Sequence, residues 1–152
     1  CPGQIVIAGT MAGVEKAAAL LDEAGARKSV ILPVSAPFHS TLMQPAAEKL
    51  AKELDKIEIR DAKIPVVANV SAEILTKAAD IKESLVKQAA SPVKWEDCVL
   101  KMKEFGADTF VEAGPGKTLC GFNKRIDRKL TSMNVENLET LQKTLDYFRE
   151  VR

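Results

Sequence analysis

Short apolar runs rich in β-branched residues alternate along this chain with segments whose apolar side chains recur at helical spacing. Such runs lie at residues 4–9, 29–35, 65–70, 108–112 and 130–135. The run at 65–70 is apolar almost throughout, which is typical of a strand buried on both faces of a parallel sheet. Strands that alternate with helices predict an α/β layer architecture with a mostly parallel sheet.

The composition is that of an ordinary globular protein. Apolar residues make up 46% and charged residues 28% of the 152 residues, enough chain for one domain or two small ones. The formal net charge of +1 gives no electrostatic case for nucleic acid or an anionic membrane as a partner. No uncharged apolar run approaches the ~18 residues of a membrane span. We therefore expect a soluble protein of the cytoplasm, or of an organelle matrix in a eukaryote.

The three cysteines, Cys1, Cys98 and Cys120, include no C-x-x-C pair. Neither a disulfide framework nor a zinc site is indicated, so we expect reduced thiols and no metal. The chain opens without Met and enters an apolar run almost at once. Such a start is typical of the interior of a longer protein.

Local signals predict where the helices begin. Ser40 can cap a helix that follows residue 40. Asp80 with Glu83 is a capping-box pattern, and Ser91 before Pro92 predicts that another helix starts there. The last helix is expected to carry Leu138, Leu141, Leu145 and Phe148 on one face.

The glycine-rich turn Gly114-Pro115-Gly116-Lys117-Thr118 raises the possibility of a phosphate-binding loop. A Walker A motif needs a further glycine where Val111 stands. The sequence therefore favours a plain turn between a strand and a helix, without nucleotide binding.

His39 is the only histidine, and it is the best candidate for a catalytic group. It follows an apolar run and a proline and comes just before a helix, where α/β proteins place their sites. A histidine there can act as a general base near neutral pH. No G-x-S-x-G motif occurs, and the neighbouring Ser40 is badly placed to face His39. If His39 is a base, its nucleophile lies outside this chain.

The backbone carbonyl of Gln88 is expected to lack its usual helical partner. In a helix the carbonyl of Gln88 would accept from the N–H of residue 92. That residue is Pro92, which has no N–H, so the carbonyl is left free.

Four ordered stretches together look familiar. They are residues 1–9 (CPGQIVIAG), 33–46 with PVSAPFHS at their start, 88–95 and 112–117 (EAGPGK). In order and spacing they resemble the malonyl-CoA:acyl carrier protein transacylase family, and the match runs through nearly the whole chain.

The resemblance implies a two-part fold, with a ferredoxin-like small subdomain inserted into an α/β-hydrolase-like large subdomain. Residues 1–33 would be the second half of the small subdomain, and residues 34–152 the C-terminal part of the large acyltransferase subdomain. The N-terminal half of the enzyme, and with it the catalytic serine, would lie outside this chain.

Enzymes of this family carry malonyl from coenzyme A to the phosphopantetheine thiol of acyl carrier protein through a serine ester. The resemblance implies that His39 is the base and that the Gln88 carbonyl orients it. Phe38, just before the histidine, accompanies malonyl selection in related polyketide acyltransferases. Malonyl-CoA, acyl carrier protein and the missing half are the implied partners. No bound cofactor is implied, since coenzyme A enters as the thioester substrate, and this chain alone should be inactive.

Two alternatives remain open. The chain can belong to the acyltransferase domain of a polyketide synthase, which uses the same chemistry. It can also be a non-catalytic interaction module that keeps the fold without the nucleophile. A G-x-S-x-G motif upstream would separate the enzyme from the module.

Overall fold

The computed structural model describes residues 1–151, which divide into two compact units. One unit spans Val6–Lys94, and the other combines Cys1–Ile5 with the residues from Trp95 onward. The subdomain boundary expected between residues 33 and 34 stays a prediction. No helix among residues 1–151 is both long enough and apolar enough to cross a membrane.

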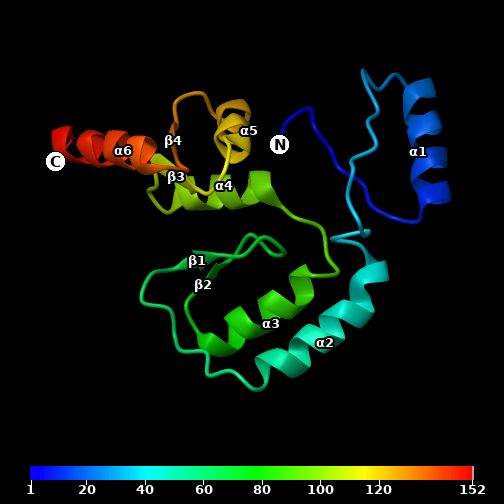
Figure 1. The fold of residues 1–152 in the computed structure, drawn as a ribbon, viewed down its shortest axis with the longest axis horizontal. Coiled ribbons are helices and arrows are strands. Elements are labelled where there is room, and N and C mark those ends of the chain that lie inside the picture. The colour runs from blue at the N-terminus through cyan, green and yellow to red at the C-terminus, as the bar shows by residue number, and fades with distance from the viewer. Residues whose placement is uncertain (152) are drawn as a thin grey trace. The chain divides into compact units, whose positions relative to one another are not determined.

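The unit from residue 95 onward contains a parallel strand pair. Its elements are α4 (Trp95–Glu104), β3 (Thr109–Ala113), α5 (Thr118–Ile126), β4 (Thr131–Val135) and α6 (Leu138–Glu150). β3 and β4 run parallel, with Thr109 opposite Thr131 and Ala113 opposite Val135, and α5 is the crossover between them (Figure 1). The chain is therefore an α/β protein, as the sequence predicted. The side chains of Cys98 and Val99 on α4 are its most deeply buried ones.

The unit of residues 6–94 contains three α-helices and one short hairpin among its described elements. Its elements are α1 (Met11–Glu23), the 3₁₀ turn η1 (Thr41–Met43), α2 (Gln44–Leu54), β1 (Val66–Val67), β2 (Ile74–Leu75) and α3 (Ala78–Gln88). α2 and α3 lie side by side in Figure 1 and are in contact. Ala47 on α2 and Ala68 after β1 are buried. This packing fixes α3, whose last residue belongs to the candidate site.

The buried parallel strand predicted at residues 65–70 is wrong. β1 covers only Val66–Val67 and pairs with β2 in an antiparallel hairpin. Ala72, with φ of 60°, turns the chain back, and Ala68 N–H donates to the Glu73 carbonyl at 3.1 Å. Because the turn closes within a few residues, the apolar run cannot extend into a longer strand.

The strands predicted at residues 4–9 and 29–35 are also not formed in the part of the chain that the structure describes. Their side chains are largely exposed, with Ile5 at 90% and Val30 at 61%. A strand needs a neighbouring backbone to satisfy its N–H and C=O groups. These segments have the composition of strands, but nothing among residues 1–151 forms a ladder with them.

The predicted start signals for α3 and α4 are corrected by tertiary contacts. α3 has no side-chain cap of its own, and Asp61 accepts from Ala78 N–H at 2.9 Å in place of the Asp80–Glu83 box. α4 begins at Trp95 rather than at Ser91-Pro92, and Lys94 N–H, just before the helix, donates to the Asn69 carbonyl at 2.8 Å.

The apolar face of α6 is largely exposed. Leu138 is 83% exposed, and Leu141 and Leu145 are also exposed. The buried residue is instead Thr144, whose hydroxyl donates to the Thr140 carbonyl at 2.9 Å, so burial leaves no unmet donor. The face of α6 that carries Thr144 is the one turned inward.

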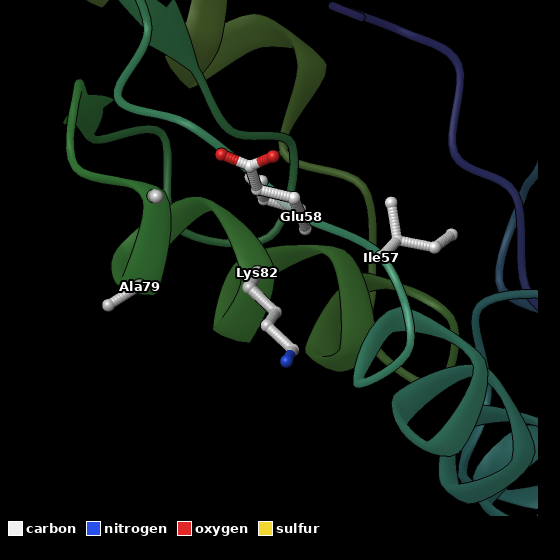
Figure 2. A pocket seen from close by; sticks show the side chains of 6 residues that line it. Ile57, Glu58, Ala79 and Lys82 are labelled. Carbon is white, nitrogen blue, oxygen red and sulfur yellow. The ribbon is translucent and has the colours of Figure 1, made fainter.

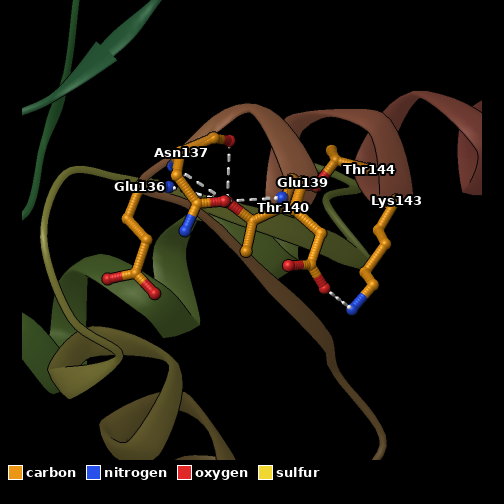
Figure 3. A network of polar contacts seen from close by, with 6 residues as sticks. All are labelled: Glu136, Asn137, Glu139, Thr140, Lys143 and Thr144. Atoms are coloured by element: carbon orange, nitrogen blue, oxygen red, sulfur yellow. Dashed lines mark hydrogen bonds and ion pairs between the residues drawn. The ribbon is translucent and has the colours of Figure 1, made fainter.

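A reciprocal capping box starts α6 (Figure 3). Asn137 Oδ1 accepts from Thr140 N–H at 3.0 Å, and Thr140 Oγ1 accepts from Asn137 N–H at 3.1 Å. The usual box has Glu or Gln at the second position, so Asn137 with Thr140 does not match the usual sequence pattern. These two bonds satisfy backbone donors that the first helical turn leaves free.

We predict that Asn137→Ala destabilises the protein by about 1 kcal/mol, the usual loss when a capping side chain is removed. Urea unfolding measures the change. Gln142→Ala is the matched control, since it removes only an exposed bond to Asp146 on the same helix. Such a pair contributes about 0.2–0.5 kcal/mol. Equal losses for the two variants would contradict the capping role.

Candidate active site

His39 lies in a loop that leads into the helical part of its unit. The loop spans residues 36–40 and is followed directly by η1 and α2. The His39 side chain is exposed, as a group that must meet a substrate needs to be. The single histidine therefore lies before a helix, as its place in the sequence predicted.

His39 and Gln88 meet, although 49 residues separate them in the sequence. The His39 Nδ1 atom is 3.0 Å from the Gln88 backbone oxygen, well within hydrogen-bond distance. The predicted contact is thus confirmed. α3 ends at Gln88, and Pro92 cannot donate to this carbonyl, as the sequence predicted. The carbonyl is not left entirely free, because Ser91 N–H also donates to it, at the longer distance of 3.4 Å.

This contact determines which ring nitrogen of His39 carries the hydrogen. A carbonyl oxygen can only accept a hydrogen bond, so Nδ1 must carry the hydrogen. In the neutral imidazole Nε2 then keeps its lone pair. The arrangement gives His39 the tautomer of a general base, in the way that an aspartate orients the histidine of a serine-hydrolase triad.

The backbone of His39 adopts a left-handed conformation, with φ of 60°. Histidine visits this region more often than most residues, but the conformation still costs roughly 1–2 kcal/mol. Strain of this kind persists only where the surroundings hold it. The loop is held by two short contacts: Phe38 N–H donates to the Ala36 carbonyl at 2.9 Å, and the Ser40 hydroxyl donates to the Pro37 carbonyl at 2.7 Å.

Ser40 was expected to cap the following helix, and this expectation is wrong. It stands at the N-cap position just before η1, but its side chain makes no capping bond and turns back to Pro37 instead. The sequence gives no sign of this arrangement, because it depends on the left-handed residue that precedes Ser40.

Phe38 is next to His39 and is 48% exposed. The residue is therefore not buried in the core of its unit. The structure brings Phe38, His39 and Gln88 into one neighbourhood, as the sequence predicted, and a role for Phe38 in selecting the acyl group stays a prediction.

The glycine-rich turn at residues 114–118 connects β3 to α5 and is stabilised by contacts within the protein. Gly114 and Gly116 have φ of 141° and 85°, values that favour glycine. The N–H groups at the start of α5, where a phosphate would bind, donate to the Glu112 carboxylate: Leu119 N–H at 3.1 Å and Cys120 N–H at 2.9 Å. Burial alone would raise the Glu112 pKa, but these donors hold that pKa below its ordinary value. The turn is therefore already occupied by a protein anion.

Two hollows lie in the unit of residues 6–94. The larger, about 320 Å³, is lined by Ile57, Glu58, Ile59, Ala78, Ala79 and Lys82 (Figure 2). In Figure 2 Glu58 and Lys82 point away from each other, and Lys82 pairs with Asp55 at 2.8 Å. The hollow presents no nucleophile or histidine, so it is a poor site for acyl transfer.

The smaller hollow, about 190 Å³, is lined mainly by aliphatic side chains of β1, β2 and α3. Gln88 borders it and also holds His39, which makes this the hollow most closely linked to the candidate base. Among residues 1–151, no three His, Cys, Asp or Glu side chains gather as metal ligands.

The sequence of this chain was compared with known protein families and proteins. A model of the acyl transferase domain matches residues 1–146. A malonyl CoA-acyl carrier protein transacylase of Bacillus subtilis is 49% identical over 150 residues, which are 99% of this chain and 47% of that protein. The chain spans about half the length of the curated relatives it matches.

Solved structures agree with these matches. An acyl-carrier-protein S-malonyltransferase from Burkholderia pseudomallei is 43% identical with a TM-score of 0.87, over 91% of this chain and 45% of that one. A malonyl transacylase solved in complex with its type II polyketide synthase acyl carrier protein is 38% identical with a TM-score of 0.88, over the same shares of the two chains, 91% and 45%.

Proposed function

This chain belongs to the acyl transferase domain family, and we propose that it is the C-terminal part of a malonyl-CoA:acyl carrier protein transacylase of fatty acid biosynthesis. The single observation that carries the proposal is the 3.0 Å contact between His39 Nδ1 and the Gln88 carbonyl, which prepares His39 as a base. The names of relatives at 46–49% identity support the choice of substrates.

The proposed reaction has two halves. His39 Nε2 takes the proton of a serine hydroxyl as the serine attacks the thioester carbonyl of malonyl-CoA, and the imidazolium returns that proton to the departing thiolate of coenzyme A. In the second half the phosphopantetheine thiol of acyl carrier protein gives its proton to Nε2 and attacks the malonyl ester. The serine leaves with that proton, so the enzyme is regenerated.

The serine of this scheme lies outside residues 1–152, since the scheme needs a G-x-S-x-G motif that these residues lack. We place it in the part of the enzyme that the relatives have in addition to the stretch matched here. The working partners are therefore malonyl-CoA, acyl carrier protein and that N-terminal part. Throughout the proposed cycle His39 moves protons and the Gln88 carbonyl keeps the ring oriented, with no bound cofactor.

The acyltransferase of a polyketide synthase remains the second candidate. It is favoured by the likeness to the transacylase solved with a polyketide synthase carrier protein. The chemistry at His39 is the same in both cases, and the two differ in the carrier protein that accepts the malonyl group.

We predict that the purified 152-residue chain transfers no malonyl, because a base without a nucleophile has nothing to activate. A chimera in which this chain replaces the matching part of the Bacillus subtilis relative should transfer malonyl from coenzyme A to acyl carrier protein. Radiolabelled malonyl-CoA measures both. Transfer by the isolated chain would contradict the proposal, and an inactive, folded chimera would favour the interaction module.

Two variants of the chimera assign the activity to the site. His39→Ala should lower kcat by about 10²–10⁴-fold, the usual contribution of a general base. Gln88→Ala should keep most of the activity, because the contact uses the backbone oxygen, which the substitution retains. If Gln88→Ala were as damaging as His39→Ala, the Gln88 side chain rather than its carbonyl would be essential.

We predict that Phe38→Ser changes acyl selection. A bulky ring can fill the space that the α-methyl group of methylmalonyl would need, and the fit of one such group is worth about 10–200-fold. The ratio of kcat/KM for methylmalonyl-CoA to that for malonyl-CoA should therefore rise in the chimera. An unchanged ratio would mean that Phe38 only packs in the loop.

A further inference from the structure

The Ser40 side chain has a contact that the proposed reaction does not use. Its hydroxyl is half-buried and donates to the Pro37 carbonyl at 2.7 Å, the usual distance for a well-formed hydroxyl bond. The Ser40 backbone is extended, with φ of −124° and ψ of 165°, which leaves the side chain free to turn back along the chain. Its proton is engaged by a carbonyl, so Ser40 is not placed as the nucleophile.

The bond from Ser40 to Pro37 spans His39, the candidate base. Pro37 lies two positions before His39 and Ser40 one position after it, so the hydroxyl bond closes a small loop around the histidine. Within that loop His39 has φ of 60°, a conformation that non-glycine residues keep only when it is held. The Phe38 N–H bond to the Ala36 carbonyl lies before the histidine, whereas the Ser40 bond bridges it.

The His39 ring must also point at a fixed target. Its Nδ1 donates to the carbonyl at the end of α3, 49 residues further along the chain. The direction in which a side chain leaves the backbone changes when φ changes sign, so a right-handed His39 would aim its ring elsewhere. The loop geometry and the Nδ1 contact therefore depend on each other.

We propose that Ser40 is a positioning residue for His39: its hydroxyl holds the left-handed backbone that directs Nδ1 to the Gln88 carbonyl. This inference rests on the proposed function, because it assigns Ser40 a part in presenting the base. Ser40 acts through His39 and needs no contact with the substrate.

The test uses Ser40→Ala in the chimera with the Bacillus subtilis relative. Loss of one neutral hydrogen bond that holds the loop should lower kcat about fivefold. KM for malonyl-CoA should change little, since the substrate is not touched. Ser40→Thr keeps a hydroxyl and should restore kcat to about the original value.

Ser29→Ala is the matched control. It removes a serine hydroxyl of the same unit that also donates within its own stretch of chain, to Asp22 at 2.6 Å. Its kcat should equal that of the parent chimera. If Ser40→Ala loosens the fold, Ser40→Cys keeps the size of the side chain with a weaker donor and should give a smaller loss of kcat.

Crystal structures separate this inference from the proposed function. In Ser40→Ala the His39 φ should leave the left-handed region, or the distance from Nδ1 to the Gln88 oxygen should exceed 3.5 Å, whether or not the chimera is active. A parent chimera without activity would count against the proposed function alone. An unchanged His39 geometry, an unchanged kcat, or a raised KM with constant kcat in Ser40→Ala would each overturn the role of Ser40.

Discussion

The hydrogen bond from His39 Nδ1 to the Gln88 carbonyl joins the two segments on which the site depends. It brings a loop before α2 to the last residue of α3, and its length is 3.0 Å. In a helix each carbonyl normally accepts from the N–H four residues later, but the residue four after Gln88 is Pro92, which has no N–H. Because a carbonyl only accepts, one main-chain atom fixes both the orientation and the tautomer of the candidate base.

The rest of the unit keeps the two ends of this bond in place. Asp61 accepts from the first residue of α3 and pairs with Lys77 at 2.8 Å, and that pairing, with the Ala78 N–H, lowers the Asp61 pKa. Beyond α3, the Asn69 carbonyl receives the Lys94 N–H at 2.8 Å, so the chain leaves the helix in a fixed direction. At the other end, the loop of residues 36–40 holds His39 itself.

Part of the site could be read from the sequence, because two of its features are local, whereas the pairing of His39 with Gln88 across 49 residues was implied by the family resemblance. The sequence itself shows a proline four residues after Gln88 and a single histidine before a predicted helix. The left-handed backbone of His39 and the inward turn of the Ser40 hydroxyl were not visible, since neither follows from a residue's own preference. The apolar runs at residues 4–9 and 29–35 were predicted to be strands for a similar reason. A strand needs a partner backbone to bond with, and the composition of a run does not show whether one is present.

The orientation of His39 can be measured directly. His39 is the only histidine of this chain, so joining a chain labelled with ¹⁵N-histidine to an unlabelled N-terminal part gives an imidazole signal from this residue alone. At a pH where the ring is neutral, the account predicts that Nδ1 carries the hydrogen and Nε2 gives the resonance of an unprotonated nitrogen. A ring that is mainly protonated at Nε2 would contradict it, because Nδ1 could not then donate to the Gln88 carbonyl.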